Sequence, residues 1–200
     1  MKHLSERFGL PDHGEEWSYC LGCLDNIATI YNITDTALPE ISIFNFIASK
    51  QNPIYFNAWK VRDSKSLFDL CLVSYEIVYY TASRTGGHRH TESHLYFFGH
   101  LNLTKDFGNA LIHPETLGDK ITELFDSVEI DLKTYPKFNR KYFVLAENKH
   151  DFALLLKSEL IKYIQNIEGL QIEFRNNNCI FRLENAVDER ESMQLCEIGL

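Results

Sequence analysis

Hydrophobic and polar positions alternate most clearly in the middle of the chain, and the alternation predicts three β-strands. Residues 54–61 form the first, and residues 67–81, rich in β-branched and aromatic side chains, form the second. Residues 83–87 end in Gly-Gly and predict a hairpin turn, because glycine adopts positive φ at little cost. The third strand runs from about residue 89 to 103, and Gly99 is the expected site of a β-bulge.

The last third of the chain predicts a strand, a helix and two further strands. Residues 141–146 form an apolar strand covered on both faces, and Asn148 with Asp151 resembles a capping box. The helix that follows ends at Gly169. We expect four of its apolar residues, Phe152, Leu156, Leu160 and Ile164, to face the sheet, with Tyr163 and Ile167 on the same side. Strands at 170–174 and 179–183, joined by an Asn-rich turn, complete this β-α-β-β unit.

The remaining segments give weaker patterns. Trp17, Tyr19 and Leu21 alternate with small or polar residues, which indicates a strand, and residues 41–46 indicate another. A short strand at 110–112 leads into a helix that starts at His113-Pro114-Glu115 and ends near residue 127. The acidic tail, residues 184–200, is expected to be helical.

These elements predict an α+β fold: an antiparallel β-meander followed by a helix and the β-α-β-β unit, with the helices packed on the sheet. The 200 residues are enough for one well-buried core, and no repeat or linker divides them. We therefore expect a single domain over residues 1–200, with residues 1–40 as its least certain segment.

Charge and cysteine content narrow the class of protein. The chain has 20 Lys and Arg against 28 Asp and Glu, a formal net charge of −8, which argues against a nucleic-acid binder. The first residues lack the apolar core of a signal peptide, and no uninterrupted apolar run is long enough to span a membrane. The five cysteines are odd in number and sparse, so we expect reduced thiols and a cytoplasmic location.

A resemblance covers residues 75–183. After the long aromatic strand pair come Ala110-Leu111-Ile112-His113-Pro114-Glu115, Val128-Glu129-Ile130-Asp131 and the segment Pro136-Lys137-Phe138-Asn139-Arg140-Lys141-Tyr142-Phe143-Val144. Together with the helix and terminal hairpin, these segments resemble a widespread group of uncharacterised bacterial proteins known only as domains of unknown function. The resemblance implies a fold unit; it implies no activity and no site residues.

A histidine cluster is the sharpest candidate for metal chemistry. His88, His90 and His94 lie within seven residues, and neutral imidazole is a good ligand for zinc or nickel. On a strand, residues i and i+4 lie roughly 13 Å apart, so His94 is too far away to share an ion with His88 or His90. Only His88 and His90 could chelate together, with Glu92 as the nearest carboxylate. We expect no metal site and no cofactor here, only a polar hairpin tip.

Cys20 and Cys23 have the C-x2-C spacing of a zinc knuckle or a redox pair. A structural zinc site needs four ligands, and no second such pair exists. We expect two ordinary buried thiols, with a zinc or redox role as the alternatives.

A basic segment with interleaved aromatic residues spans 132–150. Four of its side chains, Lys133, Lys137, Arg140 and Lys141, are candidates for contact with phosphate or an acidic partner. The alternative is a solvated connection that leads into the next strand.

The chain contains no nucleophile elbow, P-loop, dinucleotide fingerprint or H-E-x-x-H motif. The sequence therefore favours a non-enzymatic interaction, regulatory or structural module with a protein partner. Two alternatives stay open: a metal-dependent hydrolase that uses the His88 and His90 hairpin, and a protein that binds a small apolar ligand.

Overall fold

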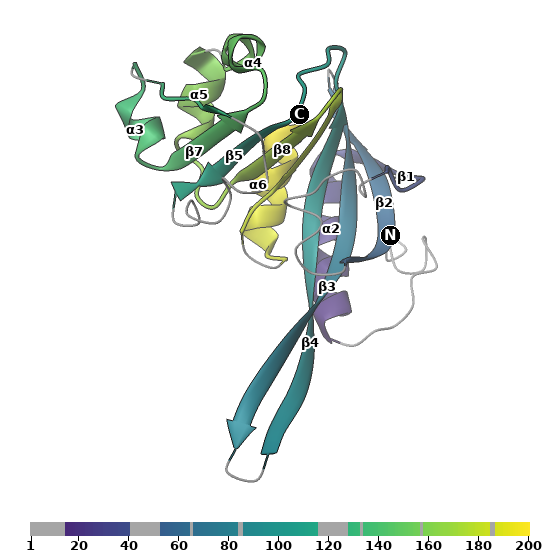
Figure 1. Ribbon diagram of the computed structural model, residues 1–200. Coiled ribbons are helices and arrows are strands. Elements are labelled where there is room, and N and C mark those ends of the chain that lie inside the picture. The colour runs from purple at the N-terminus through teal and green to yellow at the C-terminus, as the bar shows by residue number, and fades with distance from the viewer. Residues whose placement is uncertain are drawn as a thin grey trace.

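The computed structural model in Figure 1 describes residues 15–40, 53–64, 66–83, 86–115, 128–132, 134–156, 158–184 and 187–200. At positions 15–16, 53–56, 75–79, 82–83, 91–93, 128, 154 and 158 only the backbone is described.

Helices and strands alternate irregularly along the described ranges. The helices are α2 (Glu15–Ile30), α3 (Pro136–Asn139), α4 (Lys149–Leu155), α5 (Ser158–Ile164) and α6 (Glu189–Gly199). The strands are β1 (Asn32–Thr36), β2 (Pro53–Arg62), β3 (Leu67–Ser83), β4 (Gly86–Asn102), β5 (Ala110–Pro114), β6 (Val128–Glu129), β7 (Tyr142–Ala146), β8 (Gln171–Arg175) and β9 (Asn178–Arg182).

The strands form one sheet in the order β1-β2-β3-β4-β9-β8-β5-β7-β6, nine strands within the described ranges. The paired neighbours run antiparallel, and β1 to β4 follow one another as a meander. Figure 1 shows α3, α4 and α5 gathered beside β5 and β7, and α2 behind β2 to β4. The predicted α+β class, with helices packed on an antiparallel sheet, is confirmed.

The main hydrophobic core lies between one face of the sheet and the helices. Alternate strand residues supply one side of it, because successive side chains of a strand point to opposite faces. Among the largest buried contributors from the strands are Trp59, Phe68 and Phe181, and α2 and α4 contribute Leu24 and Phe152.

Residues 15–30 form a helix, so the strand predicted from Trp17, Tyr19 and Leu21 is wrong. The buried residues of α2 are Trp17, Cys20, Cys23, Leu24 and Ile27, which recur at the three- and four-residue spacing of a helical stripe. Tyr19, by contrast, is 48% exposed. The alternation covered too few residues to compete with the longer helical period.

The helix predicted after Asn148 is divided in two. Its start is confirmed, since the Asn148 side chain accepts a hydrogen bond from the backbone N–H of Asp151. Leu156 leaves the helical conformation at ψ 61°, and a second helix, α5, follows. The break shifts the buried stripe: Phe152, Leu156 and Ile164 are buried as predicted, but Ile161 takes the fully buried place expected for Leu160.

Two further predictions about strands are corrected. Gly99 pairs with Leu70 in an unbroken register, and the irregularity lies in β2 between Tyr55 and Asn57. β5 continues through Pro114, so the predicted helix does not start at His113. The rest of that predicted helix, and the alternating run at 41–46, lie outside the described residues.

The acidic C-terminal segment is helical, as predicted. The Asp188 carboxylate caps α6 by accepting hydrogen bonds from the backbone N–H groups of Arg190 and Glu191. Leu195 and Cys196 are buried in the same core as α2, so α6 forms part of the packed body.

Candidate interaction site: the β3–β4 arm

β3 and β4 extend past the rest of the sheet as a two-stranded arm. The two strands pair without interruption from Asp69↔His100 to Ser83↔Gly86. β2 pairs with β3 only as far as Tyr75, and β9 pairs with β4 only over residues 99–102. Beyond those points each strand of the arm has only the other as a strand partner among the described residues. Figure 1 shows the arm projecting away from the body.

The arm presents two open backbone edges. Its eight residue pairs beyond Tyr75 span roughly 27 Å at the usual rise of a strand. On β4, the carbonyl of Leu95 accepts a hydrogen bond from the N–H of Val187 at 2.9 Å, so it points away from β3. Because backbone groups alternate along an antiparallel strand, the N–H and C=O of Arg89, Thr91 and Ser93 point the same way. These groups form the outer edge of β4.

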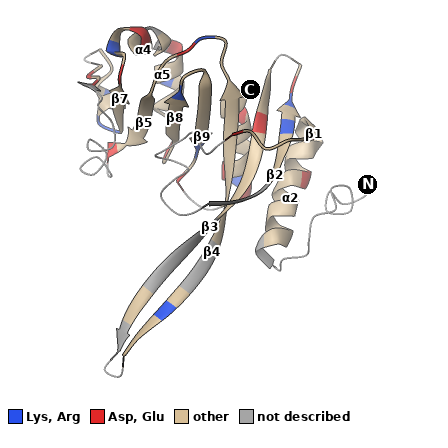
Figure 2. Cartoon of the chain, turned by 45° about the vertical axis from the view of Figure 1, so that its right-hand side comes forward, with Lys and Arg blue, Asp and Glu red and all other residues tan. Residues whose placement is uncertain are grey.

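Side chains near the tip of the arm are exposed. Tyr80 is 78% exposed, and it lies directly across the ladder from Arg89, which is also exposed. In Figure 2 the ribbon is coloured red for Asp and Glu at several places on the body and nowhere on the part of the arm that is not grey. A large exposed aromatic ring beside a guanidinium is a pair that protein interfaces favour.

The structure places the predicted metal candidates on this arm. His88 and His90 lie opposite Thr81 and Tyr79, both imidazoles are exposed, and the unbroken register puts His94 on the same face of β4. Glu92 lies opposite Ile77, with only its backbone described. Among the residues whose side chains are described, no three His, Cys, Asp or Glu are close enough to share a metal ion. The absence of a metal site at His88, His90 and Glu92 stays a prediction.

A partly buried polar row crosses the sheet at the end of β3 and β4 that lies farthest from the arm. The Asp69 carboxylate accepts from the Lys60 ammonium at 2.9 Å and lies 3.2 Å from Nδ1 of His100, whose Nε2 lies 3.1 Å from the Asn178 amide oxygen. Burial alone would raise the pKa of Asp69, but hydrogen bonds from His100 and Lys60, with the Lys60 charge, hold it below its usual range. The row ties together β2, β3, β4 and β9.

Sequence reasoning did not find this row. Its signal is one polar residue in the otherwise apolar stretch of several strands, as with Asp69 between Phe68 and Leu70. A separate contact also joins β9 to β4. The guanidinium of Arg182 lies over the rings of Tyr96 and Phe98, at 5.4 and 5.5 Å from their centroids.

The predicted cysteine pair lies inside the body. Cys20 and Cys23 are both free and buried, in the core cluster that also contains Cys196 of α6. Burial raises the pKa of Cys23, and it raises the pKa of Cys196 to about 12. A thiol that stays protonated is a poor nucleophile, which favours the interpretation as ordinary buried thiols.

The basic segment is only partly free for a partner. Lys137 and Arg140 are exposed at α3 and its C-terminal cap. The Lys141 ammonium donates to the carbonyl of Gln165 at 3.4 Å, and Lys133 lies outside the described residues. Partner binding by this segment stays a prediction.

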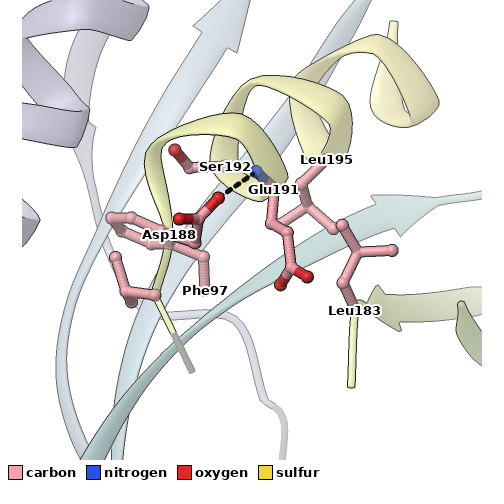
Figure 3. A pocket seen from close by; sticks show the side chains of 7 residues that line it. Phe97, Leu183, Asp188, Glu191, Ser192 and Leu195 are labelled. Atoms are coloured by element: carbon pink, nitrogen blue, oxygen red, sulfur yellow. Dashed lines mark hydrogen bonds between the residues drawn. The ribbon is translucent and has the colours of Figure 1, made fainter. Parts of the chain in front are cut away.

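The hollows beside α6 do not suit an apolar ligand. Figure 3 shows the one between Phe97, Leu183 and the first turns of α6, a cavity of about 10 Å³, no more than one water molecule needs. A larger groove of about 540 Å³ borders it, but it is polar and carries the carboxylates of Glu168, Glu184 and Asp188. Small apolar ligands prefer mostly apolar pockets of several hundred Å³, so neither hollow supports that alternative.

No described helix is both long and apolar enough to cross a membrane. The chain matches no known protein family, no characterised protein and no solved structure.

Proposed function

We propose that this protein is an interaction module whose binding element is the β3–β4 arm. The observation that carries the proposal is the geometry of β3 and β4, whose distal halves extend past β2 and β9 and pair only with each other among the described residues. A two-stranded ribbon of this kind contributes little to a packed core. Along both edges it offers N–H and C=O groups that no described strand pairs with, and a partner strand can complete them.

The exposed side chains support the same proposal. Tyr80 and Arg89 lie together near the tip of the arm, where a partner could bury the ring and the guanidinium at the same time.

The experiment is site-specific photo-crosslinking in the cells that produce the protein. One variant carries a photoreactive phenylalanine derivative at Tyr80, and the matched control carries it at Tyr163 of α5, which is also a surface tyrosine, 42% exposed. We expect an adduct of discrete mass from the arm variant and none from the control. Equal labelling from both positions, or no adduct from Tyr80, would overturn the proposal.

The expected compartment and the resemblance belong to this proposal. Five free, buried cysteines support a reducing compartment such as the cytoplasm. Kinship with the uncharacterised bacterial group is likewise proposed, on the sequence segments that carry the resemblance.

A further inference from the structure

We infer that the partner of the arm is a second copy of this chain, joined to the first through the outer edges of their β4 strands. This inference rests on the proposed function of the arm and names its partner. The two arms would form a four-stranded antiparallel ribbon about a two-fold axis.

The charge distribution favours a second copy. Between residues 76 and 94 two glutamates balance two arginines, so the whole excess of eight negative charges lies in the rest of the chain. Two bodies of that charge repel each other, whereas two arms carry no net charge at neutral pH. Because the arm projects from the body, the copies can join at their neutral parts while the acidic bodies stay apart.

Backbone direction fixes which residues can pair. Arg89, Thr91 and Ser93 have their N–H and C=O groups on the outer edge of β4, as the hydrogen bond between Leu95 and Val187 shows. A two-fold axis at Thr91 places Thr91 opposite Thr91 of the second copy and Arg89 opposite its Ser93. Each of these positions is then a hydrogen-bonded pair of an antiparallel ladder.

The same register is favourable for the charged residues. His90 comes to lie opposite Glu92 of the second copy, and the symmetry repeats this pair. Both are at non-hydrogen-bonded positions, where opposed Cα atoms are only about 4.5 Å apart, so this register sets a histidine and not a second carboxylate opposite each glutamate. A register centred on Glu92 would oppose two glutamates, and one centred on Arg89 would oppose two arginines. The edge of β4 is thus complementary to itself in the register centred on Thr91.

The test is sedimentation equilibrium of the purified chain between about 5 and 200 µM, a range suited to micromolar affinity. Wild type is expected to pass from monomer mass to dimer mass. Thr91→Pro removes an outward N–H at the centre of the proposed ladder and is expected to weaken the dimer at least about tenfold, or roughly 1.4 kcal/mol.

Val78→Pro is the matched control. Val78 lies opposite Thr91 in the ladder, and its N–H points out from the other edge of the arm. This variant is expected to dimerise like wild type. Circular dichroism checks that both variants stay folded.

A charge swap gives a second readout that does not depend on proline. His90→Glu alone places two carboxylates in opposition and weakens the dimer, whereas His90→Glu combined with Glu92→His restores the pair and the dimer. Failure of the double variant to recover would overturn the register.

The outcomes separate this inference from the proposed function. The wild-type chain could stay monomeric up to the highest concentration and still form a Tyr80 adduct, with an added mass that differs from that of a second chain. That result overturns the inference and leaves the arm as an interaction element. A monomeric chain with no Tyr80 adduct overturns both. Equal weakening by Thr91→Pro and Val78→Pro would show that β4 is not the edge that pairs.

Discussion

Gly99 lies where β4 passes beneath a buried ring. A Cβ atom placed on Gly99 would come within 2.1 Å of the Phe181 ring, which itself packs on Phe68. The ring is 1% exposed and has little room to move aside. Gly99→Ala is therefore expected to lower the free energy of unfolding by about 1–3 kcal/mol, the usual cost of overpacking. Urea denaturation followed by tryptophan fluorescence measures the change.

Gly22→Ala is the natural control for that substitution. Gly22 is exposed in the middle of α2, and an added Cβ meets nothing within 4 Å. Since alanine favours a helix over glycine, this variant is expected to gain up to about 1 kcal/mol. If Gly99→Ala is as harmless as Gly22→Ala, the close approach of Phe181 is not a constraint on the fold.

Asp69 links stability to pH. Its pKa is lowered in the folded protein by the hydrogen bonds from His100 and Lys60. A carboxylate with a lowered pKa stabilises the fold above its unfolded pKa of about 4, and that contribution is lost as pH falls through the lower folded value. Asp69→Asn is expected to cost about 1–3 kcal/mol at neutral pH, since it removes charged hydrogen bonds.

Thermal unfolding of both proteins from pH 7 down to pH 2 measures this linkage. The gap in stability between wild type and Asp69→Asn is expected to narrow as the pH falls below about 4. A gap that stays constant down to pH 2 would mean that the charge of Asp69 does not stabilise the fold.

At the scale of elements, the break between α4 and α5 decides which residue enters the core. Ile161 is fully buried, whereas its neighbour Leu160 is only partly buried against the same core. Ile161→Ala is expected to cost about 2–5 kcal/mol, and Leu160→Ala clearly less, because a half-exposed side chain leaves a smaller cavity. Denaturant titration of the two variants compares them directly. Equal losses would indicate one continuous helix with the phase first predicted.

Strands proved more predictable than helices in this chain for a physical reason. The strands of the meander and the last hairpin carry long alternating or β-branched runs, and that pattern follows directly from burial of one face. The buried stripe of α2 contains a tryptophan and two cysteines in place of aliphatic residues, so its helical periodicity is hard to recognise in the sequence. The break at Leu156 is hard to recognise, since the polar residues 157–159 after it also fit the exposed side of one continuous helix and no Gly or Pro is present.

At the scale of the whole molecule, the sequence predicted the two strands of the arm but not its projection from the body. The lengths of β3 and β4 follow from residue types, and both strands were predicted nearly to their ends. The two glycines expected in the turn instead begin β4, where Gly86 pairs with Ser83 and Gly87 with Ala82. The sequence does not indicate where the neighbouring strands β2 and β9 end relative to β3 and β4. β2 and β9 are shorter than β3 and β4, and the four strands β5 to β8 come between β4 and β9 in the described part of the chain. The projection of the arm is a property of that pairing and not of any local motif.

Deletion of the arm tests how separate it is from the body. We expect that replacing residues 76–93 by Asn-Gly, which closes a two-residue hairpin between the hydrogen-bonded pair Tyr75 and His94, leaves the fold intact. The removed residues pair only with one another among the described strands, and the core cluster contains none of them. The melting temperature should therefore stay within about 4 °C of wild type, the shift that roughly 1 kcal/mol causes in a domain of this size.

The same variant can be used to measure both thermal stability and dimerisation. We expect the shortened chain to melt like wild type, to remain monomeric and to form no adduct from a probe near the turn. These results would show that the arm is needed for binding and that the body folds without it. A much lower melting temperature would instead show that the arm belongs to the cooperative unit, and the long strands would then need a structural explanation. The polar row at Lys60, Asp69 and His100 lies outside the deleted segment, so its pH dependence should survive in the shortened chain. Loss of that dependence together with the arm would mean that the arm affects the row at the far end of its own strands.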